Sequence, residues 1–391
     1  MKVLSVNAGS SSLKFQMYEM PEEKVLISGL FERIGINDSF YSIKINGEKT
    51  KKEAELKDHS DAVRILCDEL LENKVISSLD EIEAVGHRLV HGGDKYPNSV
   101  VIDEDVVKTV ESLTDLAPIH VPANLIGVRA FQELIPNANE VGVFDTSFHQ
   151  TMEKEAYLYS VPYEYYEKYG VRKYGFHGTS HKFVSERMNE ILGKNDTKII
   201  TCHVGSGGSI SAVKNGKCID TSMGFTPNAG IMMGTRSGDI DYTLIDYMMK
   251  KSGKTLAELD TELNKKSGLE GICGASDLRD VEQGIDDGDE KCILAYDMYV
   301  KRIVEYIAKY YVLLGGCDAI VMTAGGGENS RVLREKVIDR LSCLGIKLDK
   351  EANDMRGEEK CISTSDSSLP VWVIPTDEEL MIARDTYNLS K

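Results

Sequence analysis

The chain has 391 residues, a length that suggests two or three domains. Of these residues 41% are apolar and 28% charged, which is typical of a globular protein. The formal net charge of −17, from 46 basic and 63 acidic residues, argues against nucleic-acid or anionic-membrane binding, because both need a basic face. The eight cysteines form no C-x-x-C pair, no apolar run approaches the ~20 residues of a membrane span, and no signal peptide is recognisable. We therefore expect a cytoplasmic protein with reduced thiols.

The first predicted elements are strands. Residues 3–6 form an apolar run that ends in a Gly/Ser turn, and residues 13–18 then alternate apolar and polar, which predicts a hairpin. Residues 25–31 can add a third strand. A helix is predicted over 61–71 from its apolar spacing, with Ser60 as its N-cap.

The next predicted strands are residues 84–90 and 141–144, and a third at 198–204 begins an internal repeat. Gly9 aligns with Gly205, so the offset is 205 − 9 = 196 residues, close to half of the chain. In both places a strand, a Gly/Ser turn and a second strand follow one another. The repeat favours a duplicated α/β protein with a cleft between its halves; chance similarity of two turns is the alternative.

The second half is more helical. Thr255 and Glu258 form a capping box at a helix start, and residues 289–314 have helical apolar spacing up to Gly315. The apolar face of this long helix is expected to contact the core or a second subunit. A buried strand is predicted at 319–322, followed directly by a Gly-rich segment.

Three Gly-rich turns that follow strands, at 9–12, 205–208 and 325–327, suit phosphate binding, because glycine lets backbone N–H groups approach phosphate oxygens. Tight turns use the same residues, so each turn alone is weak evidence. The P-loop pattern G-x-x-x-x-G-K-[ST] is absent, and the Ser-Gly-Lys-Thr segment at 252–255 lacks its upstream glycine. Lys14 lies close enough to Gly9 to reach a phosphate.

Other polar residues follow strands or lie in Gly-rich loops. Arg88 could bind a carboxylate or phosphate with its guanidinium fork, or pair with a nearby acid. Asp145 ends a strand, where α/β proteins place catalytic groups, and a serine hydrolase is disfavoured because no G-x-S-x-G elbow is present. His177 between two glycines is predicted to face a ligand. Arg236 is placed like an arginine finger supplied in cis.

Together these segments resemble the acetokinase family. The resemblance rests on motifs that run in the family's order from Asn7 to Glu379 and cover essentially the whole chain: N-A-G-S-S-S-L-K-F, H-R-L-V-H-G-G, F-D-T-S-F-H-Q, Y-G-F-H-G-T-S-H, G-T-R-S-G-D-I-D, D-L-R and P-T-D-E-E. It implies the α/β fold of acetate and sugar kinases, Hsp70 and actin, with two duplicated actin-like (ribonuclease H-like) domains flanking a nucleotide cleft. The expected domains are 1–147 plus 380–391, and 148–379 with most nucleotide contacts.

The resemblance also implies residue roles, an ATP/ADP co-substrate, a homodimer, and Mg²⁺, with Mn²⁺ as a substitute. Asn7 and Glu378 would hold the metal, and Asp145, His177 and Arg236 would be catalytic. The carboxylate substrate would bind Arg88 and a pocket made by Val90, Ile119, Phe176 and Pro227. The nucleotide would contact Lys14, His203, Val204, Gly205, Ser206, Gly207, Asp277, Leu278, Arg279, Gly325, Gly326, Gly327, Glu328 and Asn329.

The chain departs from the family's usual residues at five positions: Val121, Ser206, Asn228, Ala229 and Gly326. All lie near the expected nucleotide or pocket edges, so they bear on nucleotide preference and KM more than on the reaction.

The expected reaction is reversible transfer of the ATP γ-phosphoryl to acetate. A carboxylate with a pKa below about 5 is already ionised at pH 7, so Asp145 is interpreted chiefly as a positioner of Mg²⁺ or water. Two alternatives stay open: a propionate or butyrate kinase, since one methylene is worth only ~1–3 kcal/mol in an apolar pocket, and an actin- or Hsp70-like ATPase.

Overall fold

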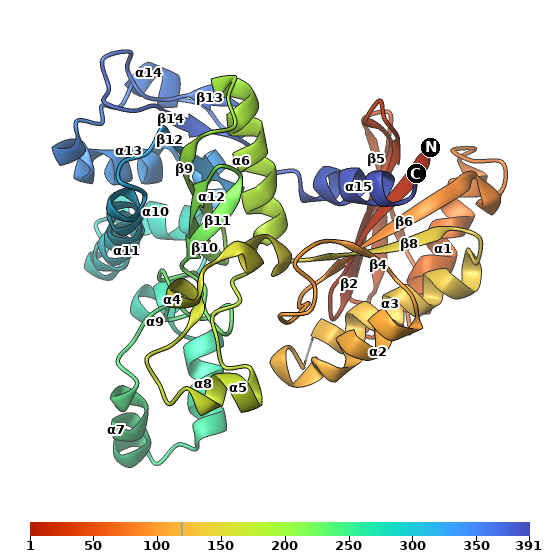
Figure 1. Ribbon diagram of the computed structural model, residues 1–391, viewed down its shortest axis with the longest axis horizontal. Coiled ribbons are helices and arrows are strands. Elements are labelled where there is room, and N and C mark those ends of the chain that lie inside the picture. Colours follow the sequence, from red (N-terminus) through yellow and green to blue (C-terminus); the bar gives the residue numbers. More distant parts are fainter. Residues whose placement is uncertain (119) are drawn as a thin grey trace. The chain divides into compact units, whose positions relative to one another are not determined.

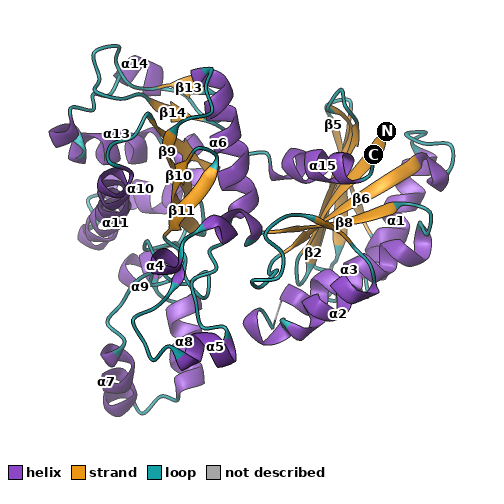
Figure 2. Ribbon diagram, viewed as in Figure 1, coloured by secondary structure: helices purple, strands orange, loops and turns teal. Residues whose placement is uncertain are grey.

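The computed structural model describes residues 1–118 and 120–391 and consists of two compact units. Unit 1 contains Met1–Phe148 together with Asp377–Lys391, and unit 2 contains His149–Thr376. Each unit is a mixed α/β structure with one sheet and flanking helices (Figures 1 and 2). The chain crosses back into unit 1 before Asp377, whereas the boundary predicted from sequence follows residue 379.

Unit 1 has an eight-stranded sheet of order β5-β4-β3-β2-β1-β6-β8-β7. Its strands are β1 (Lys2–Ala8), β2 (Ser12–Glu19), β3 (Lys24–Glu32), β4 (Phe40–Ile45), β5 (Glu48–Glu53), β6 (Ile82–Leu89), β7 (Val100–Val101) and β8 (Asn139–Phe144). Its α-helices are α1 (His59–Glu72), α2 (Glu104–Ser112), α3 (His120–Leu134) and α15 (Glu378–Leu389).

Alternation along the strands of unit 1 gives the sheet two apolar faces. Leu4 belongs to a core cluster that includes Leu66 of α1 and Phe131 of α3. Val3, its neighbour in β1, packs with Ala383 of α15 instead. The predicted hairpin and third strand are confirmed, since β1 pairs antiparallel with β2, and β2 with β3. The parallel order β1-β6-β8 brings three carboxyl strand ends to one edge of the sheet.

The N-cap prediction for α1 was wrong. Asp58, not Ser60, caps this helix, and its carboxylate accepts hydrogen bonds from the backbone N–H groups of Ser60 and Asp61. A carboxylate is a strong acceptor for the unpaired N–H groups of a first turn and also suits the helix dipole, so the earlier residue takes the cap.

Unit 2 has a six-stranded sheet of order β11-β10-β9-β12-β14-β13. Its strands are β9 (Lys198–Val204), β10 (Gly208–Lys214), β11 (Lys217–Thr221), β12 (Ala319–Thr323), β13 (Lys360–Cys361) and β14 (Val371–Val373). Its α-helices are α4 (Lys154–Tyr157), α5 (Glu164–Tyr169), α6 (Gly178–Leu192), α7 (Thr243–Ser252), α8 (Leu256–Lys265), α9 (Gly268–Cys273), α10 (Leu278–Asp286), α11 (Glu290–Leu314), α12 (Ala324–Asn329), α13 (Arg331–Arg340) and α14 (Lys350–Asn353).

The long helix α11 covers one face of the second sheet. Its buried residues, Tyr299 and Ile303 among them, share a core cluster with Ile200 and Cys202 of β9. Helix α6 packs against the other face, where Thr201 of β9 meets it. The capping box at Thr255 and the end of α11 at Gly315 are both confirmed.

The two sheets repeat one topology, as the internal repeat predicts. In each, a central strand pairs antiparallel with the next strand in sequence and parallel with a later one: β1 with β2 and β6, β9 with β10 and β12. The hairpin loops differ by one residue. Ala8 pairs with Leu13 across a four-residue loop, whereas Val204 pairs with Gly208 across a three-residue loop.

The predicted Gly-rich turn at 325–327 is wrong, because these glycines lie in helix α12. The reason is a local cap. Glu328 turns back so that its Oε1 atom accepts hydrogen bonds from Ala324 N at 2.7 Å and Thr376 N at 3.0 Å. A side chain that satisfies first-turn N–H groups lets even a glycine-rich segment begin a helix.

Over the described residues, no helix is both long enough and apolar enough to span a membrane.

Candidate active site

In unit 1 an ion-paired cluster lies at the carboxyl ends of the parallel strands. Arg88 on β6 donates from Nε to Asp145 Oδ1 at 2.9 Å and from Nη2 to Oδ2 at 2.6 Å. Its Nη1 donates to Asn7 Oδ1 of β1 at 3.2 Å. Asp145 itself is buried, and it directly follows β8. This bidentate pair fixes the plane of the guanidinium group.

Helix α15 brings further acids to this cluster. Asp377 caps the helix, Glu378 begins it, and Glu379 pairs with Lys14 Nζ at 2.5 Å. Burial raises the pKa of Glu378 to about 7, and the Asp145 and Glu379 carboxylates add to the rise against the opposing charges of Arg88 and Lys14. The carboxylates therefore repel one another at neutral pH.

A divalent cation would relieve this repulsion. Within the described residues no group of three or more His, Cys, Asp or Glu side chains is arranged to hold a metal by itself. Mg²⁺ is usually held by only one or two carboxylates, with water and substrate phosphates as its other ligands. The Glu378 carboxylate and the Asn7 amide oxygen are donors of the kind that Mg²⁺ prefers, so these residues fit such a site.

A buried asparagine joins two of these strand ends. Asn124 of α3 donates to Ala8 O at 2.7 Å and accepts from Val90 N at 3.0 Å. His59 Nε2 lies 2.7 Å from Gly9 O and so anchors the opening turn. Val90, predicted to line the acetate pocket, is half-buried beside this junction. Ile119, predicted for the same pocket, lies outside the described residues.

In unit 2 the His177 ring is held by contacts with His203 and Ser209. The residue has a left-handed backbone (φ 57°) immediately before α6, and its ring stacks on His203 with 4.1 Å between the ring centroids. Its Nδ1 atom lies 2.9 Å from Ser209 Oγ. At Gly175, two residues earlier, a β-carbon would come within 2.7 Å of His149 and of Thr221, so only glycine allows this approach.

Arg236 shares the surroundings of His177. A β-carbon built on Gly207 would lie 3.3 Å from Arg236 Nη1 and 3.6 Å from His177 Nε2, so both polar ends border this glycine. Arg236 Nη1 donates to Pro227 O at 3.1 Å, and among the described residues no carboxylate pairs with this arginine. Burial lowers the pKa of Arg236. A half-buried guanidinium group without a counterion is well suited to bind an anion.

Unit 2 also contains a cavity of about 400 Å³. Eight of its lining residues were predicted as nucleotide contacts: Gly205, Ser206, Asp277, Leu278, Arg279, Gly325, Gly326 and Asn329. Seven others were not predicted: Gly234, Leu269, Ser276, Glu282, Tyr299, Ser330 and Arg356. At Gly326 a β-carbon would lie 2.6 Å from Leu278 Cδ1, so leucine fills the space that a branched residue would need.

The remaining predicted nucleotide contacts of unit 2 do not line this cavity. His203 stacks on His177, Gly207 borders Arg236, and Glu328 caps α12. Val204 is fully buried in the core. Gly327 is also buried, and its carbonyl accepts from Arg334.

Comparison with known proteins agrees with the resemblance found in the sequence. The profile of the acetokinase family matches residues 2–384. The chain is 54% identical to the acetate kinase of Bacillus cytotoxicus, over 99% of this chain and 98% of that protein. The chain belongs to the acetokinase family.

Solved structures of the family show the same fold. The structure of Porphyromonas gingivalis acetate kinase superposes with a TM-score of 0.95 at 48% identity, and each chain is covered completely. A propionate kinase from Francisella tularensis gives a TM-score of 0.94 at 41% identity, with 99% of each chain covered. The two-domain actin-like fold expected from the sequence is therefore confirmed.

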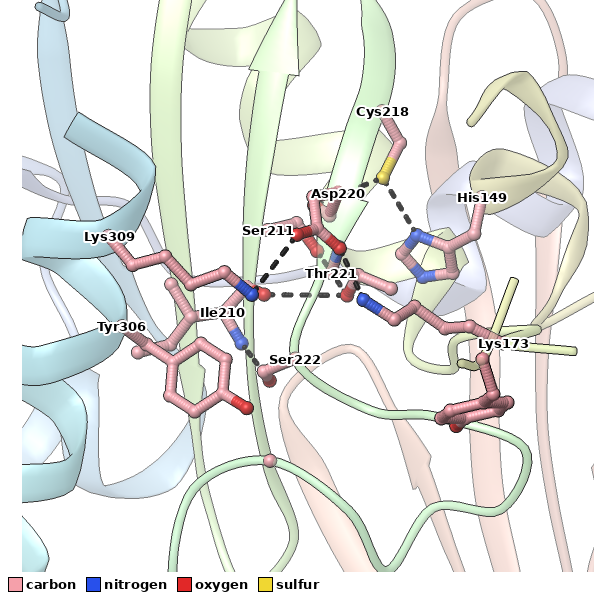
Figure 3. Close-up of polar contacts among 12 residues, drawn as sticks. His149, Lys173, Ile210, Ser211, Cys218, Asp220, Thr221, Ser222, Tyr306 and Lys309 are labelled. Carbon is pink, nitrogen blue, oxygen red and sulfur yellow. Dashed lines mark hydrogen bonds and ion pairs between the residues drawn. The ribbon is translucent and has the colours of Figure 1, made fainter. Parts of the chain in front are cut away.

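Like Asn124, several residues that support the acetokinase site were missed in the sequence. His149 Nε2 donates to Phe176 O at 2.8 Å, which fixes the peptide before His177, and its Nδ1 lies 3.2 Å from Cys218 Sγ (Figure 3). Burial lowers the pKa of His149 to about 4, so the ring is neutral. Only the glycines around His177 hinted at this packing, because the contacts join segments far apart in sequence.

An ion-paired group secures the same segment. Asp220, which ends β11 with Thr221, pairs with both Lys173 and Lys309 (Figure 3). Lys173 directly precedes the loop of residues 174–177, which ends in His177, and Lys309 belongs to α11. The buried carboxylate thus holds the loop against the sheet and the long helix.

Proposed function

We propose that this chain is an acetate kinase, which transfers the γ-phosphoryl group of ATP to acetate and gives acetyl phosphate and ADP, reversibly. The observation that carries the proposal is that His177 Nε2 and Arg236 Nη1 both border Gly207, while no carboxylate among the described residues pairs with this arginine. Phosphoryl transfer needs such donors, because charge spreads over the equatorial oxygens in the transition state. The names of the family members at 54% and 48% identity support acetate as the acceptor.

Unit 1 would supply the acetate side. Two edges of Arg88 are engaged by Asp145 and Asn7, so the arginine is oriented before the substrate arrives. Its remaining N–H groups would bind the acetate carboxylate, and Val90 and Ile119 are the residues of this unit that we assign to the methyl group. Because Asp145 binds Arg88 through both oxygens, we assign it the task of orienting that arginine. No general base is required, since acetate is ionised at neutral pH.

Unit 2 would supply the nucleotide and phosphoryl side. The cavity lined by Ser206, Asp277 and Gly326 is of a size that suits a nucleoside. Arg236 and His177 would donate to the transferring group. Asn7 and Glu378, which belong to unit 1, would hold Mg²⁺, or Mn²⁺ in its place, and the metal would neutralise charge at the phosphates when bound.

Two further assignments extend the proposal. Exposed apolar side chains on α7 and at the start of α8, such as Tyr247 and Leu256, support a homodimer. Light scattering of the purified protein tests that state, and a monomeric mass would refute it. Eight unpaired cysteines support a reducing cytoplasmic setting.

Trapping the acyl phosphate with hydroxylamine tests the reaction. Acetate, propionate and butyrate are supplied in parallel with ATP and Mg²⁺, and acetate should give the highest kcat/KM. A preference for propionate would make the chain a propionate kinase, like its relative from Francisella tularensis. ATP hydrolysis without trapped product from any acid would indicate an ATPase and refute the proposal.

A further inference from the structure

A buried chain of hydrogen bonds leads to His177 from the face of the second sheet. His177 Nδ1 lies 2.9 Å from Ser209 Oγ, and the same oxygen lies 2.7 Å from His181 Nε2. His181 Nδ1 in turn lies 2.7 Å from Thr201 Oγ1. Ser209 is on β10, His181 on α6 and Thr201 on β9, and all three side chains are fully buried.

The buried donors determine which atom donates in each of these hydrogen bonds. Burial lowers the pKa of His181 well below its ordinary value, and His149 and His203 add to this effect, so the ring is neutral and has one donor and one acceptor nitrogen. Within the described part of the chain, the Thr201 hydroxyl bonds to His181 Nδ1 alone. Were Nδ1 the donor, the hydroxyl hydrogen of Thr201 would be buried without an acceptor, which folded proteins avoid.

The opposite direction leaves no buried donor unpaired. Thr201 donates to His181 Nδ1, His181 Nε2–H donates to Ser209 Oγ, and the Ser209 hydroxyl donates to His177 Nδ1. The hydrogen of a neutral His177 then resides on Nε2, the atom that borders Gly207 together with Arg236.

We propose that Thr201, His181 and Ser209 are positioning residues that hold His177 in the tautomer with its hydrogen on Nε2, aimed at the transferring phosphoryl group. The inference rests on the proposed function, in which His177 donates to that group. With the hydrogen bond from Ser209, a neutral His177 ring can donate from Nε2 across the neutral pH range. Without that hydrogen bond, donation from Nε2 would depend on protonation of the ring or on the unconstrained equilibrium between its two tautomers. The other titratable groups around the His177 ring in unit 2 are His203, which stacks on it, and Arg236, which borders the same glycine. His149 lies behind Phe176.

The tautomer can be read directly in the unmodified protein. Long-range ¹H–¹⁵N NMR spectra of protein labelled at histidine show which ring nitrogen carries the hydrogen, and His177→Asn and His181→Asn identify the two signals. We expect hydrogen on Nε2 in both rings at pH 7.5. Hydrogen on Nδ1 of His177, or a ring protonated on both nitrogens at that pH, would overturn the inference.

Kinetics supply a second, independent test. Ser209→Ala removes the donor to His177 and should lower kcat by about 10- to 100-fold, as small losses of alignment do, while KM for ATP and acetate changes little. The loss should grow as pH rises from 6 to 8.5, which loss of packing alone would not cause. Ser209→Thr keeps the hydroxyl and should recover much of the activity.

Ser211→Ala is the matched control. Ser211 lies two residues along β10 on the same face, is equally buried, and bonds to Thr221 instead (Figure 3). It should keep a wild-type kcat and pH profile. Equal losses in both variants, or a wild-type kcat in Ser209→Ala, would overturn the inference. A wild-type protein that formed no acyl phosphate would refute the proposed function, yet the NMR spectrum would still decide the tautomer.

Discussion

Replacing Arg236 by alanine tests the phosphoryl-transfer site most sharply. The guanidinium group is half-buried, burial lowers its pKa, and its polar contacts are Pro227 O at 3.1 Å and, more weakly, Met233 Sδ at 3.7 Å. An arginine supplied in cis to a transferring phosphoryl typically contributes at least about 1000-fold to kcat, or about 4 kcal/mol of transition-state stabilisation. We therefore expect kcat to fall by about that factor in the hydroxylamine assay.

The surroundings of Arg236 also predict that its replacement by alanine changes the stability of the fold little. Arg236→Ala removes a desolvated charge and leaves one carbonyl without its donor, so the melting temperature should shift by less than about 3 °C. ATP affinity, measured by calorimetry, should change by less than about threefold, because the interaction is made in the transition state. Arg331→Ala, an exposed arginine paired with Asp354, is the control and should match wild type. Unchanged kcat in a folded Arg236→Ala protein would refute the assigned role.

Three further predictions concern other parts of the chain. Arg88→Ala should raise the KM for acetate and lower kcat, since it removes the proposed carboxylate anchor and leaves Asp145 unpaired; an unaltered acetate KM would contradict the assignment. Arg334→Met should lower the free energy of unfolding by about 3–5 kcal/mol, because the buried oxygens that accept the five hydrogen bonds of this guanidinium group lose their donors. Chemical denaturation measures the loss, and Arg334→Lys, which lacks the fork, should recover little. Finally, burial lowers the pKa of His91 and of His149 to about 4, so between about pH 6.5 and 4 the unfolded chain binds protons that the folded chain does not. Each of these rings should lower stability by about 1.4 kcal/mol per pH unit on acidification through that window, and a flat denaturation profile would refute this.

The sequence was most informative where structure depends on local pattern. Alternation of apolar residues is enough to predict the opening hairpin, and helical spacing with Gly315 predicts α11 nearly to the residue. The cap of α1 was misassigned because two acceptors, Asp58 and Ser60, lie close together and only the backbone path decides between them. Gly325 and its neighbours were predicted as a turn because the Glu328 carboxylate that caps their helix cannot be recognised from spacing alone.

The candidate site was predictable only in part, for a related reason. Residues in conspicuous Gly-rich motifs, such as His177 and Arg236, can be singled out in the sequence. Asn124 and Ser209 cannot, since one is a polar residue within an apolar helix and the other a serine within a strand. Their importance arises from contacts 116 and 32 residues away along the chain.

The unequal hairpin loops of the two sheets have a consequence for how a duplicated fold acquires two chemistries. Asn7 and His203 stand at equivalent positions, each one residue before the last of its central strand. The first copy offers an amide oxygen, which attracts positive partners, and the second offers an imidazole, which can donate to negative ones. The three-residue loop contains Gly207, which borders Arg236 Nη1 and His177 Nε2, whereas the four-residue loop contains Ser10 and Ser11. The two sheets thus carry different polar groups at one equivalent strand position and hairpin loops of different length beside it, while the order of their corresponding strands is the same.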